Sequence, residues 1–282
     1  MEFSIVEGDR RKAERGLKGI CPLCGEETTP KCGNIRIHHW AHKRGKNCDP
    51  WWEPETDWHR EWKRIFPERC REVTVTSIRG EKHRADVKTD CGRVIEFQHS
   101  PISFAAREAR ETFYENMAWV INGLRVKREK KRFDLQLSHA RVLQNSPLKL
   151  RIPIGNCVLI RTWVNSKVGV YIDFGDTLFS DIRFNFSIPA LWRLFPGHQE
   201  SHVELAPVWQ AEFIDAALNG GSINGINAPN IAISRDREDA EPELNRIGQL
   251  PKTVDISPKY RRQKSESDLE YSLRVRGLDG DG

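Results

Sequence analysis

Apolar and polar residues alternate on both sides of a short turn in the segment HRADVKTDCGRVIEFQHS, which runs from residue 83 to residue 100. The apolar positions are spaced by two, as in strands that bury one face; they are Ala85, Val87, Ile95 and Phe97. The alternate positions hold Asp86, Glu96 and Gln98. The pattern therefore predicts a β-hairpin with a polar face that carries two carboxylates and an amide.

The turn between the strands decides how those polar residues are paired. Asp90, Cys91 and Gly92 suit a three-residue loop, with Gly92 supplying the left-handed conformation that such loops need at their last position. With that loop Asp86 faces Glu96, and their Cβ atoms are about 4.5–5.5 Å apart. A two-residue loop would place the two carboxylates on opposite faces.

Two like charges at that distance are destabilising unless positive charge lies between them. A divalent cation such as Mg²⁺, which takes one or two carboxylates and keeps several waters, would supply it. The alternative is an ordinary amphipathic hairpin with a solvated polar face.

The segment PETDWHREWK predicts a helix ahead of the hairpin. Glu55, His59 and Lys63 are spaced by four and would stack along one helical face, and Pro54 suits the first helical position. This polar row would lie near the carboxylates of the hairpin, although a solvated face with ordinary charge pairs fits the spacing equally well.

A second helix is predicted after the hairpin, within SFAAREARETFYENMAWVI. Arg107, Arg110 and Tyr114 share one of its faces, from which guanidinium groups could bind phosphate. They could equally be surface charges paired with Glu108 and Glu111.

The pattern divides the chain into four parts. Residues 1–50 hold a cluster of cysteine and histidine, and residues 51–145 follow the order helix, strand, strand, strand, helix. Residues 146–227 form a small α+β extension, with strand-like CVLIRTWV and VGVYIDFGD and a short helix around PVWQAEFIDAAL. Residues 228–282 mix charge with Pro, Ser and Gly and predict a disordered tail.

The first part predicts a structural zinc site. Cys21 and Cys24 have the spacing at which two thiolates chelate one tetrahedral ion. His39 and His42 would complete the site if their segment is helical or tightly turned, and Cys48 or Cys32 could replace one of them. Buried thiols with surface histidines are the alternative.

Composition indicates the kind of partner and the cellular compartment to expect. The chain has 282 residues, 30% of them charged, with a formal charge of +5, which is compatible with a polyanionic partner. We find no apolar run of the roughly 20 residues that span a bilayer and no secretion signal, so we expect a cytoplasmic protein without membrane contact. Seven cysteines in a reducing compartment favour metal ligation over disulfides.

The basic run from Arg125 to Arg132 could follow a nucleic-acid backbone or form a charged linker.

Several of these motifs, in this order, resemble the motifs of a known protein family. Asp86, nine residues and then Glu96-Phe97-Gln98 resembles the PD-(D/E)xK nuclease signature in its E-x-Q variant. The larger set, which covers residues 15–125, resembles the nuclease-like domain of the competence protein CoiA family; it comprises CPLCG, HHWAH, the Glu55-His59-Lys63 row, HRADV, IEFQHSPIS, and Arg110 with Tyr114.

The resemblance implies an α/β fold with a restriction-endonuclease-like mixed sheet flanked by helices. It implies a DNA nuclease that uses Mg²⁺ or Mn²⁺, in DNA uptake, recombination or defence against foreign DNA, without a small-molecule cofactor. Asp86, Glu96 and Glu55 would hold the metal, and Gln98 would orient the attacking water or polarise the phosphate. His59 and Lys63 would be neighbours of the site, and the candidate nucleic-acid contacts are Arg84, Arg110 and Tyr114.

The glutamine is where the chain departs from the usual signature. The amide of Gln98 cannot protonate a leaving group or carry positive charge, so proton transfer would fall to metal-bound water, Lys63 or His59. A non-catalytic zinc-containing nucleic-acid-binding protein on the same fold is the alternative function, and a zinc-dependent protein-interaction module is a third.

Overall fold

The protein is described by a computed structural model that covers residues 1–35, 37–43, 48–175, 179–181, 184–186, 190–197, 201–223 and 225. The chain forms two compact units, Met1–Lys88 and Thr89–Gly282. The predicted disordered tail, residues 228–282, lies outside the described residues. Within the part of the chain that is described, no helix is long and apolar enough to cross a membrane.

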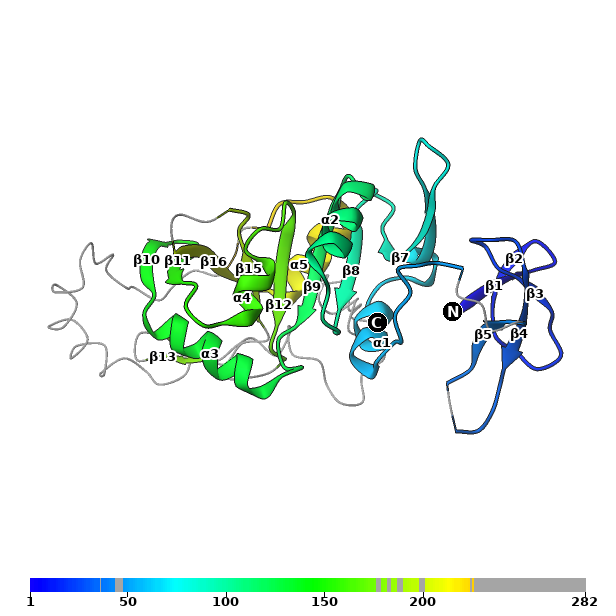
Figure 1. Cartoon of the computed structure of the whole chain (residues 1–282), viewed down its shortest axis with the longest axis horizontal. Helices are drawn as coiled ribbons and strands as arrows, with labels where there is room; N and C mark the ends of the chain where they lie inside the picture. The colour runs from blue at the N-terminus through cyan, green and yellow to red at the C-terminus, as the bar shows by residue number, and fades with distance from the viewer. Residues whose placement is uncertain are drawn as a thin grey trace, which may run out of the picture. The chain divides into compact units, whose positions relative to one another are not determined.

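The first unit begins with a small antiparallel sheet (Figure 1). Its strands, in the spatial order β2-β1-β3-β4-β5, are β1 (Phe3–Val6), β2 (Asp9–Lys12), β3 (Gly19–Ile20), β4 (Glu27–Lys31) and β5 (His39–His42). Val6, Ala13 and Trp40 form its buried apolar cluster. Strand β5, at one edge of this sheet, carries His39 and His42 of the cysteine and histidine cluster.

A helix and a hairpin complete the first unit. Helix α1 (Asp57–Arg64) begins after Thr56, whose side chain accepts a hydrogen bond from the backbone N–H of His59. The predicted start at Pro54 was therefore wrong, because Thr56 is the stronger cap. After a 3₁₀ turn (Glu68–Cys70), β6 (Arg71–Thr76) pairs antiparallel with β7 (Lys82–Lys88).

The second unit is built on a mixed sheet. In the order β10-β11-β16-β15-β12-β9-β8, the strands β8, β9 and β12 are parallel neighbours and the others pair antiparallel. The strands are β8 (Val94–Gln98), β9 (Met117–Asn122), β10 (Arg141–Asn145), β11 (Leu148–Pro153), β12 (Gly169–Asp173), β15 (Ala190–Leu194) and β16 (His202–Trp209). A separate pair is formed by β13 (Phe179–Asp181) and β14 (Phe184–Phe186).

Helices cover both faces of this sheet (Figure 1). They are α2 (Phe104–Phe113), α3 (Lys127–Ser138), α4 (Val158–Trp163) and α5 (Gln210–Asn219). Trp119 of β9 donates to Glu111 of α2 and packs on Trp163 of α4, with ring centroids 5.2 Å apart. Tyr171 of β12 belongs to the opposite face by strand alternation and packs on Phe213 of α5, at 4.5 Å. Burial on both faces is what parallel strands require.

Two expectations for this region were wrong. Met117–Asn122, taken as the end of a helix, is strand β9, since its first five residues are all buried and suit the middle of a parallel sheet. Val158–Trp163, taken as a strand, is helix α4, in which only Ile160 and Trp163 are buried. Short apolar runs fit either structure, and burial in the whole fold decides between them.

The turn that follows Lys88 is anchored by the last described helix. The Sγ atom of Cys91 contacts the carbonyl oxygen of Ala217 at 3.2 Å, and the Arg93 guanidinium donates to the carbonyl of Ala216 at 3.4 Å. Both carbonyls belong to α5, so the C-terminal part of the fold holds this turn in place.

We predict that Gly123→Ala lowers the free energy of unfolding by about 1–3 kcal/mol, the usual cost of overpacking. A Cβ at Gly123 would lie 2.4 Å from Cε1 of the buried Phe174 ring. Gly33→Ala is the control, because a Cβ there meets nothing within 4 Å. Urea unfolding of both variants tests this, and equal stability would mean that Phe174 can move aside.

Candidate functional site

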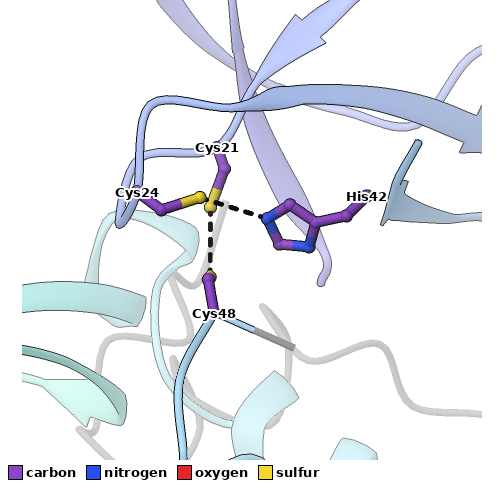
Figure 2. A group of neighbouring side chains, drawn as sticks. All are labelled: Cys21, Cys24, His42 and Cys48. Carbon is purple, nitrogen blue, oxygen red and sulfur yellow. Dashed lines mark hydrogen bonds between the residues drawn. The ribbon is translucent and has the colours of Figure 1, made fainter. Parts of the chain in front are cut away.

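Four side chains of the first unit point toward one another (Figure 2). They are Cys21, Cys24, His42 and Cys48, and their ligand atoms all lie within 4.8 Å of one another. The two thiols of Cys21 and Cys48 are 3.8 Å apart, and Cys24 Sγ lies 3.3 Å from His42 Nε2. The group has the size and the atoms of a metal centre.

Three different segments deliver these ligands. Cys21 and Cys24 stand on a tight turn closed by the hydrogen bond from the Gly25 N–H to the Cys21 carbonyl (2.9 Å). Gly25 has a φ of 75°, the left-handed conformation that glycine adopts readily. His42 ends strand β5, and Cys48 comes from the segment that follows.

The donor set fits zinc. Zn²⁺ prefers four thiolate and imidazole ligands, at about 2.3 Å from sulfur and about 2.0–2.1 Å from nitrogen, so tetrahedral ligand atoms lie roughly 3.5–3.8 Å apart. Burial together with the neighbouring Cys21 and Cys24 thiols raises the pKa of Cys48 to about 12. Crowded thiols hold protons in this way unless a cation binds their thiolates. The group could bind zinc, and four protein ligands would leave no position open for catalysis.

Two candidate zinc ligands lie elsewhere. His39 is three residues before His42 in strand β5, and residues an odd number apart in a strand point to opposite faces. Its Nδ1 lies 2.9 Å from the carbonyl oxygen of Ile37. Cys32 packs on the apolar cluster around Trp40. The expected helical or tightly turned segment is a strand, so Cys48, the alternative ligand, takes the place of His39.

Cys48 is fixed by the residue beside it. Asp49 is 4% exposed, and its carboxylate lies 2.9 Å from His83 Nδ1 and accepts the backbone N–H of Arg84 at 2.9 Å. His83 also stacks on Trp51, with ring centroids 3.3 Å apart. The metal-binding segment and strand β7 are thereby joined through one buried carboxylate.

A second cluster of the first unit surrounds Lys63. The side chain is buried, and its ammonium donates to Glu72 at 2.9 Å and also to Glu55. Burial lowers the pKa of Lys63, but the nearby carboxylates of Glu72, Glu55 and Asp86 raise it by more, so its pKa lies well above the ordinary range. Lys63 therefore stays charged and is a source of positive charge rather than a base.

Glu72 is a site residue that the sequence analysis missed. The pairs Arg71–Val87 and Val73–Ala85 on either side place it opposite Asp86. Burial raises the pKa of Glu72, and the opposing effects of Lys63 and Arg84 bring it well below its ordinary range. Glu72 also has a φ of 48°, which is rare for a residue with a side chain and typical of functional or strained positions. A carboxylate beside Arg71 at the start of the strand REVTVT was the only signal available.

Glu55, His59 and Lys63 do not form the continuous helical row that their spacing predicts. Glu55 precedes the cap of α1, although its carboxylate still reaches Lys63. The Nδ1 atom of His59 lies 3.0 Å from the Thr56 hydroxyl, so this ring takes part in the helix cap. Only Lys63 occupies the interior of the cluster.

The second unit holds the other two residues of the predicted catalytic set. Glu96 and Gln98 share one face of β8, and both are buried. The Arg110 guanidinium lies 3.6 Å from Glu96 and donates to the Gln98 amide oxygen at 3.4 Å. The Gln98 amide nitrogen donates to the Ser100 carbonyl at 3.0 Å, which fixes the orientation of the amide.

Two predicted nucleic-acid contacts, Arg110 of α2 and Tyr114 at its C-cap, are interior residues. Arg110 is 6% exposed and Tyr114 is 2% exposed, so neither presents its polar group to a ligand at the surface. Arg107 pairs with Glu111 at 3.4 Å, but this pair is buried as well, unlike the surface pairing considered above. Arg84 of the first unit is half-buried, with its backbone held by Asp49.

The region that holds the four converging side chains is similar to known proteins. Residues 9–50 match the family described as competence protein CoiA, N-terminal domain, and this region contains all four ligands of the group. The chain is also similar to the competence protein CoiA of Bacillus subtilis (strain 168), with 25% identity over 160 residues. Both comparisons find similarity to competence protein CoiA. The aligned part is 52% of this chain and only 43% of the Bacillus CoiA protein. No solved structure matches the chain.

We predict about one zinc per chain by elemental analysis of the purified protein. Cys48→Ser should lose this zinc, because it removes one of four converging ligands. His39→Ala and Cys32→Ser are matched controls that should keep it, since neither side chain belongs to the group. Loss of zinc in His39→Ala with retention in Cys48→Ser would contradict the ligand set.

For the second cluster, we predict that Glu72→Gln lowers the free energy of unfolding by about 3–5 kcal/mol, because it leaves the buried Lys63 charge under-compensated. The double variant Lys63→Met with Glu72→Gln should be less destabilised than the sum of the two single variants. Glu68→Gln, which breaks an exposed pair with Lys12, should cost at most about 1 kcal/mol. Additive effects in urea unfolding would refute the coupling.

Proposed function

We propose that the protein is a divalent-metal-dependent nuclease that hydrolyses phosphodiester bonds of DNA on a restriction-endonuclease-like core. Asp86 and Glu96 are the proposed ligands of Mg²⁺ or Mn²⁺, with Glu55 as a supplementary acid. Gln98 is the residue that orients the attacking water or polarises the phosphate. The zinc group of residues 21–48 serves folding and the placement of nucleic acid.

The observation that carries the proposal is the turn between the two strands. Thr89 donates its N–H to the carbonyl of Arg93 at 2.9 Å, so three residues, Asp90 to Gly92, form the loop. Gly92 has a φ of 82°, the left-handed conformation that this loop needs. A three-residue loop is the length that the argument for a shared face of Asp86 and Glu96 requires, and it therefore supports the proposed metal site.

The chemistry follows from the residues around each carboxylate. A bound divalent ion would activate water and neutralise phosphate oxygens. Lys63 donates to the proposed ligand Glu55, and Arg110 lies 3.6 Å from Glu96, so a fixed positive charge lies beside each of these proposed ligands. Gln98, held by Arg110 and Ser100, offers a preoriented amide and no proton donor of acid strength.

We further propose a role in competence for this chain, from its likeness to the Bacillus CoiA protein. DNA uptake, recombination and defence against foreign DNA are the processes in which such a nuclease would act. Because the aligned region is 43% of that relative, this role rests on the shared part of the two chains.

A second candidate is a nucleic-acid-binding protein without catalysis. It is favoured by the protein cations themselves, because Lys63 bonds to Glu72 and Arg110 lies beside Glu96. Charge compensation of these carboxylates therefore does not by itself require a metal. Binding that persists in EDTA, with no cleavage in any divalent metal, would select this candidate.

We predict that nicking of supercoiled plasmid depends on Mg²⁺ or Mn²⁺ and falls at least about 100-fold in Asp86→Ala and in Glu96→Ala, since loss of a catalytic metal removes several kcal/mol of transition-state stabilisation. Glu115→Gln, which alters an exposed carboxylate between α2 and β9, is the control that should keep activity. Nicking that persists in both alanine variants, after purification of each to constant specific activity, would sink the assignment.

A further inference from the structure

A cavity of about 130 Å³ lies in the second unit at the carboxyl ends of the parallel strands β8 and β9. Gln98 and Asn122 end these strands and line it, together with residues of α4 and the start of α3. In open sheets of this kind, the crevice outside the carboxyl ends of parallel strands is the usual place for a ligand. Gln98, the proposed catalytic residue, is thus also part of the cavity lining.

The walls of the cavity are mostly apolar, with Ile121, Leu159 and Trp163 among them. The carboxylate of Glu129 is already bonded, to the Arg132 guanidinium at 2.7 Å and to the backbone N–H of Leu159 at 3.1 Å. The walls therefore suit a neutral group held by van der Waals contact more than a charged one.

The volume limits what can enter. A water-sized group needs roughly 10–15 Å³ on this measure of cavity volume, so 130 Å³ accommodates about ten non-hydrogen atoms. A single nucleobase has this size, and a base pair is about twice as large. The cavity can hold one unpaired base.

Exposed basic residues follow the cavity along the chain. Arg125 lines it and is exposed, and three further exposed cations follow on the first turns of α3, namely Lys127, Arg128 and Lys131. Lys130 and Arg132 of the same run are engaged with Asp134 and Glu129. Exposed cations in a row favour the phosphates of a nucleic-acid strand.

We propose that this cavity binds the base of an unpaired nucleotide while Arg125 and the start of α3 bind phosphates of the same strand. The substrate class would then be single-stranded DNA or a frayed strand end, not continuous duplex. The inference deepens the proposed nuclease function by naming its substrate, and the binding step itself is independent of cleavage.

The test measures binding of the full chain in EDTA, where metal-dependent cleavage is absent. Fluorescence anisotropy compares three labelled probes, which are a 20-nucleotide thymidine strand, an abasic strand of the same length, and a 20-base-pair duplex. Because stacking of one base contributes about 1–3 kcal/mol, the thymidine strand should bind roughly 5- to 150-fold more tightly than the abasic strand.

Substitutions then test whether the base binds in the cavity. Val158→Trp fills its mouth from α4 at a position that is 51% exposed, so folding should be retained. We expect it to abolish the preference for thymidine over abasic strand, while Leu135→Trp, at an exposed position of α3 outside the cavity, keeps it. Arg125→Ala should weaken both strands alike and flatten the salt dependence, unlike Arg161→Ala on the exposed side of α4.

The outcomes separate this inference from the proposed function. Equal affinity for thymidine and abasic strands, or a preference unchanged by Val158→Trp, would overturn the base-binding cavity even if the plasmid is cleaved. A preference that depends on Val158, in a chain that cleaves nothing in any divalent metal, would support the cavity and refute the nuclease.

Discussion

The buried carboxylate of Asp49 joins the segment of Cys48 to strand β7 within the first unit. It follows Cys48 directly in the chain, and it binds the His83 ring and the Arg84 backbone of β7. A buried charge of this kind is tolerated only with such partners. The segment that carries Cys48 and the strand that carries Asp86 are therefore joined by a common interaction.

Lysine and arginine side chains, and not only a metal, compensate the charge of the buried carboxylates. A metal was expected because the carboxylates of Asp86 and Glu96 repel, whereas the structure supplies Lys63 beside Glu72 and Arg110 beside Glu96. A metal at Asp86 would have to bind alongside a lysine that is itself held by Glu55 and Glu72. Any cation bound there must therefore compete for carboxylate oxygens that already have partners.

The elements of the hairpin and the zinc group were largely predictable from local sequence. Gly92 signalled the loop length, and the CPLC turn with Gly25 signalled two of the four metal ligands. The failures were at His39, where a strand was not foreseen, and at Glu72, whose role depends on a partner strand fourteen residues away. Apolar runs such as MAWVIN were ambiguous, because only neighbouring strands reveal that both their faces are buried.

The anchoring of the hairpin turn by α5 has a consequence for the order of folding. Cys91 and Ala217 are separated by 126 positions along the chain, so this contact has high sequence separation and closes a long loop. A ribosome must release the segment up to α5 before the turn gains its support. Residues 146–219, which the sequence left without a role, thereby make the proposed catalytic hairpin a late product of synthesis, formed once most of the fold is available.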